Sequence, residues 1–439
     1  MTPTAPCVKR DGGPDAATAP FHRDMRERGV AALALTMVLC LATLLGIAFA
    51  NRSLFTEQRG ARNQSEAVQT FEAAEAGVEW AVAMLNSNQP IGDDCLPTTG
   101  PAARSFRERY GSLLPSGTGV PAATPSSAAA AAGAGELQPS CMRDGDGWNC
   151  TCPSLPGLAA TGAERGTVAF VLHVERGARP GLLHVGASGC TDGAGSCTAS
   201  RSGATATVRA TLALLPALAK LPAAAIVARG AVAADDVLFD LGANGTAGLA
   251  VQAGSAAALS RARLKTAPAV LPPHLVQPDP ALTSRPRDRF FAMYFGLSPN
   301  PWAAQPVVRA MSCSNGSGCV AAVQAALDLD RGPSLIHAAG DLRLEGPATI
   351  GSAERPALIV VDGALELAGD VMIHGLVYAA TVRWNGGPAA RPALHGALLS
   401  AGDVEGTGVA EITYDRAVLQ RLQAGAGTFV RVNGSWRDF

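Results

Sequence analysis

The sequence predicts an α+β protein in which a long N-terminal transmembrane and amphipathic α-helix precedes a β-rich globular region whose C-terminal part is a β-solenoid. Three observations predict this fold. Residues 30–50 are apolar and uncharged, residues 54–87 lack proline and repeat apolar side chains at helical spacing, and residues 335–439 contain short strands punctuated by glycine.

The composition excludes several classes of protein. The chain has 439 residues, 48% of them hydrophobic, and a formal charge of −1, which argues against a disordered chain and a polybasic nucleic-acid binder. At about 150 residues per domain, the length allows two or three packed units. Ten cysteines, several of them closely spaced, indicate a compartment outside the cytoplasm.

The N-terminal helix is predicted to cross a membrane once. Residues 30–50 span about 31 Å at the helical rise, enough for a bilayer core. Arg23, Arg26 and Arg28 precede this run and are expected to hold their flank in the cytoplasm, so the rest of the chain lies outside. No break suited to signal peptidase follows Ala50.

The second half of this helix carries one predicted packing face, which we expect to pack partly on the chain's own globular domain and partly on neighbouring helices. Its members recur at three- and four-residue spacing: Val68, Phe71, Glu75, Val78, Val82 and Leu85. A carboxylate on an apolar stripe is costly without a partner, so Glu75 is expected to meet a cation or backbone donors there. The alternative is that Glu75 reaches off the edge of the stripe into solvent.

We divide the chain into six segments. They are a cytoplasmic leader (1–29), the N-terminal helix (30–88, transmembrane at 30–50), a cysteine-containing loop or linker region (89–160), a β-rich region (161–267), a proline- and aromatic-rich insertion with a disulfide loop (268–334) and the solenoid-like region (335–439). The insertion holds clustered aromatic residues, which we expect to pack their own small core rather than to form a ligand-binding face. These aromatic residues are Phe290, Phe291, Tyr294, Phe295 and Trp302.

An internal repeat predicts the solenoid. Segments 340–346, 363–369 and 402–408 each have glycines six residues apart and each follow an apolar strand. Residues 226–232 resemble an earlier coil of the same solenoid, interrupted by the aromatic insertion. A β-sandwich is the structural alternative, because three imperfect repeats do not fix a topology.

Eight cysteines form a predicted disulfide framework. Cys190 with Cys197, and Cys313 with Cys319, enclose short glycine-containing loops that close easily. Two more bridges are expected among four cysteines whose pairing stays open: Cys95, Cys141, Cys150 and Cys152. A zinc site at Cys150 and Cys152 is disfavoured, because one intervening residue is too few and no histidine lies nearby.

No catalytic residue, metal site or cofactor is predicted, and the chain is expected not to be an enzyme. Residues 144–149 have the oxygen density of a calcium loop but lack its glycine and its distal glutamate. Two further groups are expected to be turn and edge residues of the solenoid rather than metal ligands or catalytic carboxylates. They are His337, His374 and His395, and Asp341, Asp362, Asp370 and Asp403.

The N-terminal region resembles a known family. Gly29 stands directly before the hydrophobic run, and Asn63 and the block Phe71-Glu72-Ala73-Ala74-Glu75-Ala76-Gly77-Val78-Glu79 follow at a characteristic distance. These residues are similar to the N-terminal domain of the PilX family of type IV pilus assembly proteins. The resemblance implies a class III leader cut by prepilin peptidase between Gly29 and Val30, with methylation of the new N-terminus. A looser likeness extends to the closing residues 434–439.

The resemblance implies a minor pilin. Major pilins carry glutamate at the fifth mature position, where this chain has Ala34, so the implied role is a low-copy initiator or tip subunit in pili used for cell adhesion and twitching motility. The implied partners are other minor pilins, inner-membrane pilus or secretion assembly components, prepilin peptidase and a tip adhesin. The implied location is the inner membrane with a periplasmic globular region, and later the filament or its tip.

Three alternatives remain open at this point. One is a type II secretion tip pseudopilin, which differs in its partner subunits. Another is a membrane-anchored β-solenoid protein that cleaves or binds carbohydrate, for which the solenoid aspartates are available. The third is a plain signal-anchored protein with a helical stalk, which requires neither Gly29 nor Glu75.

Overall fold

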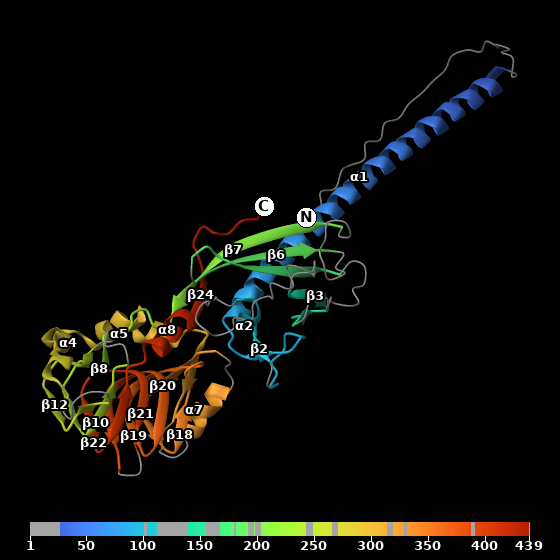
Figure 1. The fold of residues 1–439 in the computed structure, drawn as a ribbon. Helices are drawn as coiled ribbons and strands as arrows, with labels where there is room; N and C mark the ends of the chain where they lie inside the picture. The colour runs from blue at the N-terminus through green and yellow to red at the C-terminus, as the bar shows by residue number, and fades with distance from the viewer. Residues whose placement is uncertain are drawn as a thin grey trace, which may run out of the picture. The chain divides into compact units, whose positions relative to one another are not determined.

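The computed structural model describes residues 27–100, 103–111, 138–154, 167–179, 181–191, 197, 203–242, 249–265, 271–313, 319–328, 332–387 and 391–438. The protein is mixed α/β, with a long apolar N-terminal helix and a β-rich body (Figure 1). Two compact units, Met1–Gln64 and Ser65–Phe439, divide the chain inside that helix. The predicted leader through Arg26 lies outside the described residues. The six segment boundaries stay predictions.

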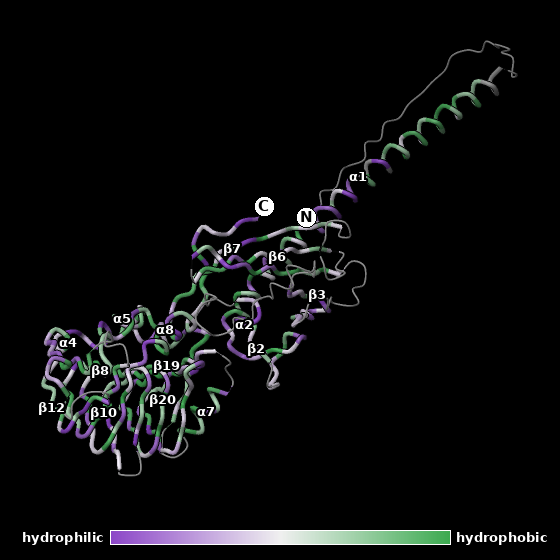
Figure 2. Tube along the Cα trace, viewed as in Figure 1, coloured by the Kyte–Doolittle hydropathy of each residue, from purple (hydrophilic) through white to green (hydrophobic). Residues whose placement is uncertain are grey.

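Helix α1 runs unbroken over Glu27–Leu85, about 90 Å at the helical rise. Residues 31–50 are exposed, and Figure 2 shows this part as a mostly hydrophobic stretch. Ala31–Leu85 is the one helix in the described part of the chain that is long and apolar enough to cross a membrane, judged by length and composition. Gly29 and Val30 lie in the first turn of α1.

Six strands form an antiparallel sheet, in the order β24-β7-β6-β5-β3-β4. Their bounds are β3 Ser140–Asp144, β4 Gly147–Thr151, β5 Ala169–Arg176, β6 Leu182–Cys190, β7 Thr205–Pro216 and β24 Gly427–Arg431. The sheet shares one hydrophobic core with the C-terminal part of α1. Beside it lie the two-stranded pair β1 (Pro90–Ile91) and β2 (Arg104–Ser105) and helix α2 (Phe106–Tyr110).

Sixteen strands form a second sheet, in which every described pairing is parallel and which is nearly closed on itself. The strands are β8 Ala224–Ala228, β9 Val232–Asp235, β10 Val237–Asp240, β11 Leu249–Ala253, β12 Ala257–Ser260, β13 Arg263–Leu264, β14 Val276–Pro278, β15 Val308–Met311, β16 Ser334–Ala338, β17 Leu342–Glu345, β18 Ala348–Ile350, β19 Ala357–Ala368, β20 Val371–Asn385, β21 Ala393–Ser400, β22 Val404–Thr407 and β23 Ala410–Thr413. The long strands β19 and β20 each pair with several others.

The three predicted glycine repeats lie on one ladder of this parallel sheet. Leu342 of β17 pairs with Leu365 of β19, Leu365 pairs with Val382 of β20, and Val382 pairs with Val404 of β22. The segment within β20 was not among the predicted repeats, because it has no glycine at its start. Strand β8, predicted as an earlier coil, pairs with β21 near the C-terminal end of the chain.

The aromatic insertion does not pack a core of its own, and that expectation was wrong. It forms η1 (Pro273–Leu275), α4 (Pro280–Ser284), α5 (Arg287–Phe295) and α6 (Pro299–Ala303). Phe291 and Phe295 lie within 4.9 and 5.6 Å of Tyr378 on β20, measured between ring centroids. Phe291, Phe295 and Tyr378 belong to the core of the parallel sheet. Strands such as β8 are buried on both faces, so helices must shield the outer face of the sheet from water.

Helices also cover other parts of the parallel sheet. Helix α7 (Cys319–Asp328) contacts β16, β17 and β18 through its buried residues Cys319 and Val323. Helix α8 (Arg416–Gly425) contacts β20 and β21 and leads into β24 of the antiparallel sheet. The C-terminal segment therefore joins the two sheets.

A histidine pair lies on the outer surface of the parallel sheet. His374 of β20 and His395 of β21 are ladder partners, and their rings stack with 4.7 Å between centroids. Partial burial and the neighbouring His395 lower the pKa of His374, whereas Asp415 and Glu354 act in the opposite direction. His337 lies apart from this pair, with Nε2 3.0 Å from a carboxylate oxygen of Asp362.

We expect the lowered pKa of His374 to make the protein less stable in mild acid. The unfolded chain binds a proton at His374 below about pH 6.5, whereas the folded chain resists it, so unfolding becomes easier as the pH falls through that range. Urea unfolding midpoints at several pH values measure the effect. His374→Gln should flatten the dependence, while His184→Gln, an exposed histidine of β6, should leave it unchanged. Equal slopes for wild type and His374→Gln would contradict the assignment.

Candidate functional site

Part of the predicted packing face of α1 packs on the chain's own sheet. Val78 and Leu85 are buried, and Phe71 and Val82 are half-buried. Val68 is 50% exposed and Glu75 is also exposed. Among the described residues Glu75 has neither the cation nor the backbone donors expected for it. Glu79 of α1 instead forms an ion pair with Arg431 of β24.

Small residues make the contact between α1 and the antiparallel sheet. Ala73, Ala74 and Ala81 are fully or almost fully buried, and a Cβ built on Gly77 would lie 2.9 Å from atoms of both Phe170 and Ala187. On the facing strand β6, a Cβ on Gly189 would lie 2.0 Å from the Thr70 carbonyl oxygen. This row of small residues is rotated around the helix from the stripe of large ones. Its helical spacing was the signal that sequence reasoning missed.

The C-terminal end of α1 is fixed by Arg107 of α2. The Arg107 guanidinium donates to the backbone oxygens of Leu85, Gly425 and Gly427 at 2.9, 3.2 and 2.7 Å. It also lies 4.8 Å from the centre of the Phe429 ring. Burial lowers the pKa of Arg107 to about 10. Arg107 thus ties α1 to the segment that joins α8 to β24.

Asn86 reinforces the same junction. Its side-chain amide donates to the Phe429 carbonyl at 3.0 Å, and its side-chain oxygen accepts the Phe429 N–H at 2.7 Å. Asn86 is itself buried, so both of its polar groups are satisfied away from water. The C-terminal end of α1 is therefore held by hydrogen bonds to β24, an edge strand of the antiparallel sheet.

The described part of the chain contains four disulfides. Cys190 pairs with Cys197 and Cys313 with Cys319. The pairing that the sequence left open is Cys95 with Cys152 and Cys141 with Cys150. The first of these joins the loop after α1 to the end of β4, and the second joins the neighbouring strands β3 and β4.

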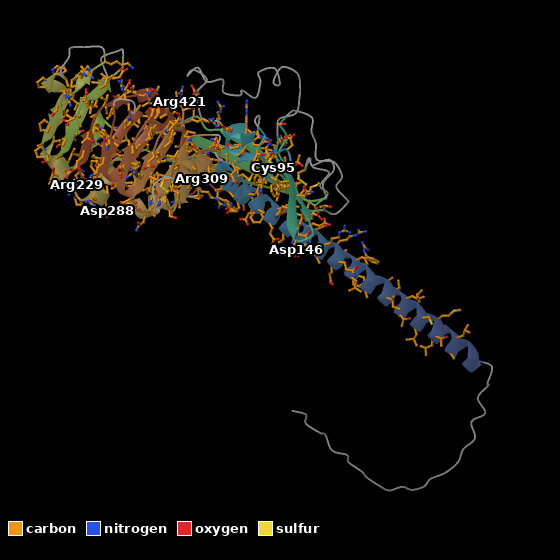
Figure 3. All side chains as sticks on the ribbon, turned by 90° about the horizontal axis from the view of Figure 1, so that it is seen from below. Cys95, Asp146, Arg229, Asp288, Arg309 and Arg421 are labelled. Atoms are coloured by element: carbon orange, nitrogen blue, oxygen red, sulfur yellow. A yellow bond between two sulfur atoms is a disulfide. The ribbon has the colours of Figure 1, made fainter. Side chains whose placement is uncertain are left out.

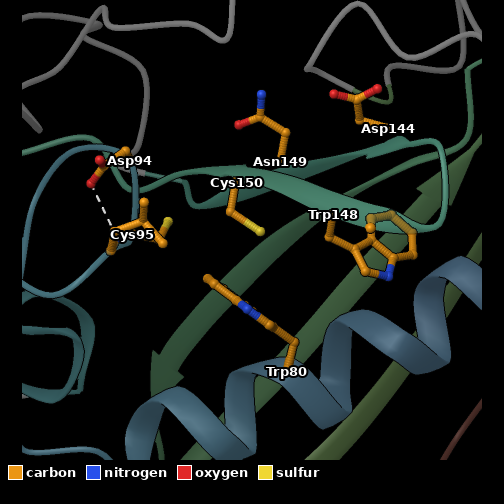
Figure 4. A pocket seen from close by; sticks show the side chains of 9 residues that line it. Trp80, Asp94, Cys95, Asp144, Trp148, Asn149 and Cys150 are labelled. Atoms are coloured by element: carbon orange, nitrogen blue, oxygen red, sulfur yellow. Dashed lines mark hydrogen bonds between the residues drawn. The ribbon is translucent and has the colours of Figure 1, made fainter.

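A pocket of about 380 Å³ lies beside these two disulfides. Trp80 of α1 and Trp148 of β4 form part of its wall, together with Cys95, Cys150 and Leu96. In Figure 4 the Trp148 and Cys150 side chains lie on the side of β4 that faces α1 and Trp80, whereas Asn149 and Asp144 point to the other side of the hairpin. Trp148 packs on Phe170 with 4.8 Å between ring centroids.

Two of the aspartates considered for catalysis hold backbone groups of the parallel sheet. Asp341 and Asp403 each accept a backbone N–H from the neighbouring rung of the parallel sheet, from Ala364 and Ala231, both at 2.7 Å. Asp146 lies at the turn of the β3–β4 hairpin (Figure 3). Across the described residues, no group of three or more His, Cys, Asp or Glu side chains could hold a metal ion.

Comparison with known proteins finds similarity among solved structures. No family model and no curated protein matches the chain. Among solved structures, the chain is similar to the competence-associated pilin ComZ from Thermus thermophilus, with 14% identity over 85% of this chain and 97% of that chain, at a TM-score of 0.24. ComZ is a pilin, but a similarity at this TM-score carries no argument. The function must be argued from the residues and their geometry.

Proposed function

We propose that this chain is a minor pilin, a low-copy initiator or tip subunit of a type IV pilus, and not an enzyme. One observation carries the proposal: a single unbroken helix, α1, is apolar and exposed over residues 31–50 and packs on an antiparallel sheet through its C-terminal part. So long an exposed apolar segment needs a bilayer or other helices around it. A subunit that moves from membrane to filament uses both environments in turn.

The partners follow from the same helix. Val68 and Glu75, exposed on α1, are available to a neighbouring subunit rather than to the chain's own sheet. On this proposal the neighbours are other minor pilins and inner-membrane assembly components, a tip adhesin can follow, and prepilin peptidase acts at Gly29. Ala34 leaves no carboxylate at the fifth mature position, which supports a specialised subunit rather than the repeating one.

The parallel sheet is, on this proposal, a β-solenoid head. Its support is the parallel register that carries Leu342, Leu365, Val382, Val404 and Val232 along one ladder. A compact domain of the size of residues 87–439 has a radius of gyration of about 20 Å, which would crowd a shaft of closely stacked subunits. At a tip, the same bulk meets no neighbour on its far side.

The carbohydrate-active alternative is less well supported. The solenoid aspartates with described contacts are engaged: Asp341 and Asp403 hold turns and Asp362 faces His337. Catalysis of glycoside cleavage needs two carboxyl groups free to act on either side of a bond, whereas these three carboxyl groups already have partners within the protein.

Gly29→Val is expected to block maturation. The bulkier side chain fills the position next to the bond that the peptidase must cut, so the chain should keep its leader and stay in the membrane. Intact mass and N-terminal sequencing of the membrane fraction measure this, with wild type expected to begin at Val30. A conservative control is Val30→Ile, which should mature normally. A wild-type chain that begins after Ala50 would contradict the proposal.

Deletion of the gene separates the pilus from the alternatives. We expect few or no surface filaments, restored by the wild-type gene, with the chain as a trace component of sheared filaments. A defect confined to protein secretion would instead indicate a type II secretion pseudopilin. Normal filament number, in cells where no other minor pilin substitutes, or this chain as the main band of sheared filaments, would overturn the low-copy role.

A further inference from the structure

One disulfide of the antiparallel sheet, Cys141–Cys150, has one of its two cysteines beside a pocket. Cys150 is half-buried and lines the pocket of about 380 Å³ beside Trp80 and Trp148. Figure 4 shows its sulfur directed into the space above Trp80. Its bonded partner Cys141 is only 1% exposed. Cys150 is therefore the more exposed of the two cysteines in this bond.

The neighbouring disulfide is the natural internal comparison. Cys95 and Cys152 are 7% and 0% exposed, although Cys95 also contributes to the pocket wall. Both bonds attach to strand β4 or its end and share one environment. Thiol–disulfide exchange depends on access to the attacked sulfur, so the two bonds should differ in rate although they lie side by side.

We propose that Cys141–Cys150 is an exchangeable disulfide, opened by a small thiolate that enters the Trp80–Trp148 pocket and attacks Cys150 Sγ. A bond forms between the reagent sulfur and Cys150 Sγ while the Cys141–Cys150 bond breaks. The electron pair leaves on Cys141 Sγ, which then takes up a proton. A second thiolate displaces Cys150, which is protonated in turn, and the two reagent molecules leave as a disulfide. Two electrons pass from the reagent to the protein.

The structural consequence is limited to one hairpin. Strand β4 is the edge of its sheet and pairs only with β3 in the described structure. Opening Cys141–Cys150 removes the covalent link between these two strands, while Cys95–Cys152 still holds the end of β4. Exchange therefore loosens the hairpin that carries Trp148 without releasing it from the body.

The charges around the pocket predict which thiols react fastest. Asp94 and Asp144 are among the lining residues, although the Asp144 side chain points to the other side of the hairpin, and no basic side chain is among them. A cationic thiol is attracted and an anionic one repelled, by about threefold each at low ionic strength. The expected order is cysteamine, then 2-mercaptoethanol, then mercaptoacetate, with rates expressed per thiolate and relative to the same thiol's reaction with hydroxyethyl disulfide. Added salt should reduce the differences in rate among the three thiols.

The test uses the full chain in detergent micelles under native conditions. After timed exposure to each thiol, free cysteines are alkylated and mapped by mass spectrometry. We expect Cys141–Cys150 to open at least about tenfold faster than Cys95–Cys152. Equal rates for the two bonds, or opening only when denaturant unfolds the chain, would overturn the proposal.

Variants test the route through the pocket. The double variant Asp94→Asn and Asp144→Asn should remove the spread between cationic and anionic thiols, while Asp288→Asn with Asp438→Asn, an exposed pair outside the pocket lining, should not. Trp148→Ala should speed the reaction several-fold by widening the access to Cys150, and Trp436→Ala, at 42% exposure against 39% for Trp148, is its matched control. An unchanged thiol order in the Asp94 and Asp144 variant refutes attack from this pocket. None of these results depends on whether the chain assembles into pili.

Discussion

Gly189→Ala is expected to lower the free energy of unfolding of the β-rich body by about 3 kcal/mol. Its Cβ would lie 2.0 Å from the Thr70 carbonyl oxygen and 2.9 Å from the Ala74 nitrogen. Both are backbone atoms of α1, so no side chain can turn away to make room. Strand β6 and the helix must separate, which costs contacts along the whole small-residue face. Urea denaturation followed by circular dichroism measures the loss.

Gly186→Ala on the same strand is the matched control. The nearest atoms to its Cβ are side-chain carbons of Arg209 and His173 at 3.6 and 3.9 Å, which is ordinary contact distance. Its effect should stay within about 0.5 kcal/mol. If the two alanine variants prove equally stable, the close approach of β6 to α1 is wrong.

Arg107→Leu should cost about 3 kcal/mol of unfolding free energy. The substitution removes the donors to three backbone oxygens, those of Leu85, Gly425 and Gly427, and leaves the oxygens without these partners at a buried junction. It also removes the cation over the Phe429 ring. Leucine replaces the volume, so the loss reports the polar contacts rather than a cavity. Thermal and urea unfolding of the same chain give the measurement.

Arg431→Leu provides the comparison for Arg107. Its guanidinium pairs with Glu79, but the Arg431 and Glu79 side chains are 38% and 65% exposed. Exposed ion pairs contribute little, so a change within about 1 kcal/mol is expected. A larger loss for Arg431→Leu than for Arg107→Leu would show that the buried junction is not where the stability lies.

Single helices and strands were predicted well from the sequence of this protein, because each of them produces a local periodicity in the chain. The absence of proline over 54–87 and the apolar run before it predict one helix, and α1 is unbroken over Glu27–Leu85. The glycine-spaced segments predict strands that repeat, and Leu342, Leu365 and Val404 lie on one ladder. In both cases the signal lies within a few residues of its effect.

What the sequence could not predict depends on distant partners. The packing face of α1 is set by how closely β6 approaches, through Gly189 and Gly77, and not by which stripe is most hydrophobic. We expected the aromatic residues of α5 to pack a small core of their own, yet Phe291 and Phe295 pack on Tyr378 of β20. Likewise Cys95 and Cys152 are separated by 57 positions, and nothing local selects that pairing.

The pairing of β8 with β21 determines when the parallel sheet can finish folding during synthesis of the chain. Ala231 and Asp403, which meet through a backbone N–H, are 172 positions apart in the chain, and Asn86 meets Phe429 across 343. Long sequence separations of this kind slow folding, because a large loop must close before the contact is gained. During synthesis, β11 can pair with one edge of β8, but the other edge stays unpaired until β21 has been made. One edge of β7 stays unpaired for longer, until β24 has been made. Chains truncated before residue 393 therefore lack both β21 and β24, and each sheet keeps an unpaired edge. We expect such chains to be degraded by proteases or to aggregate rather than to function as shorter subunits.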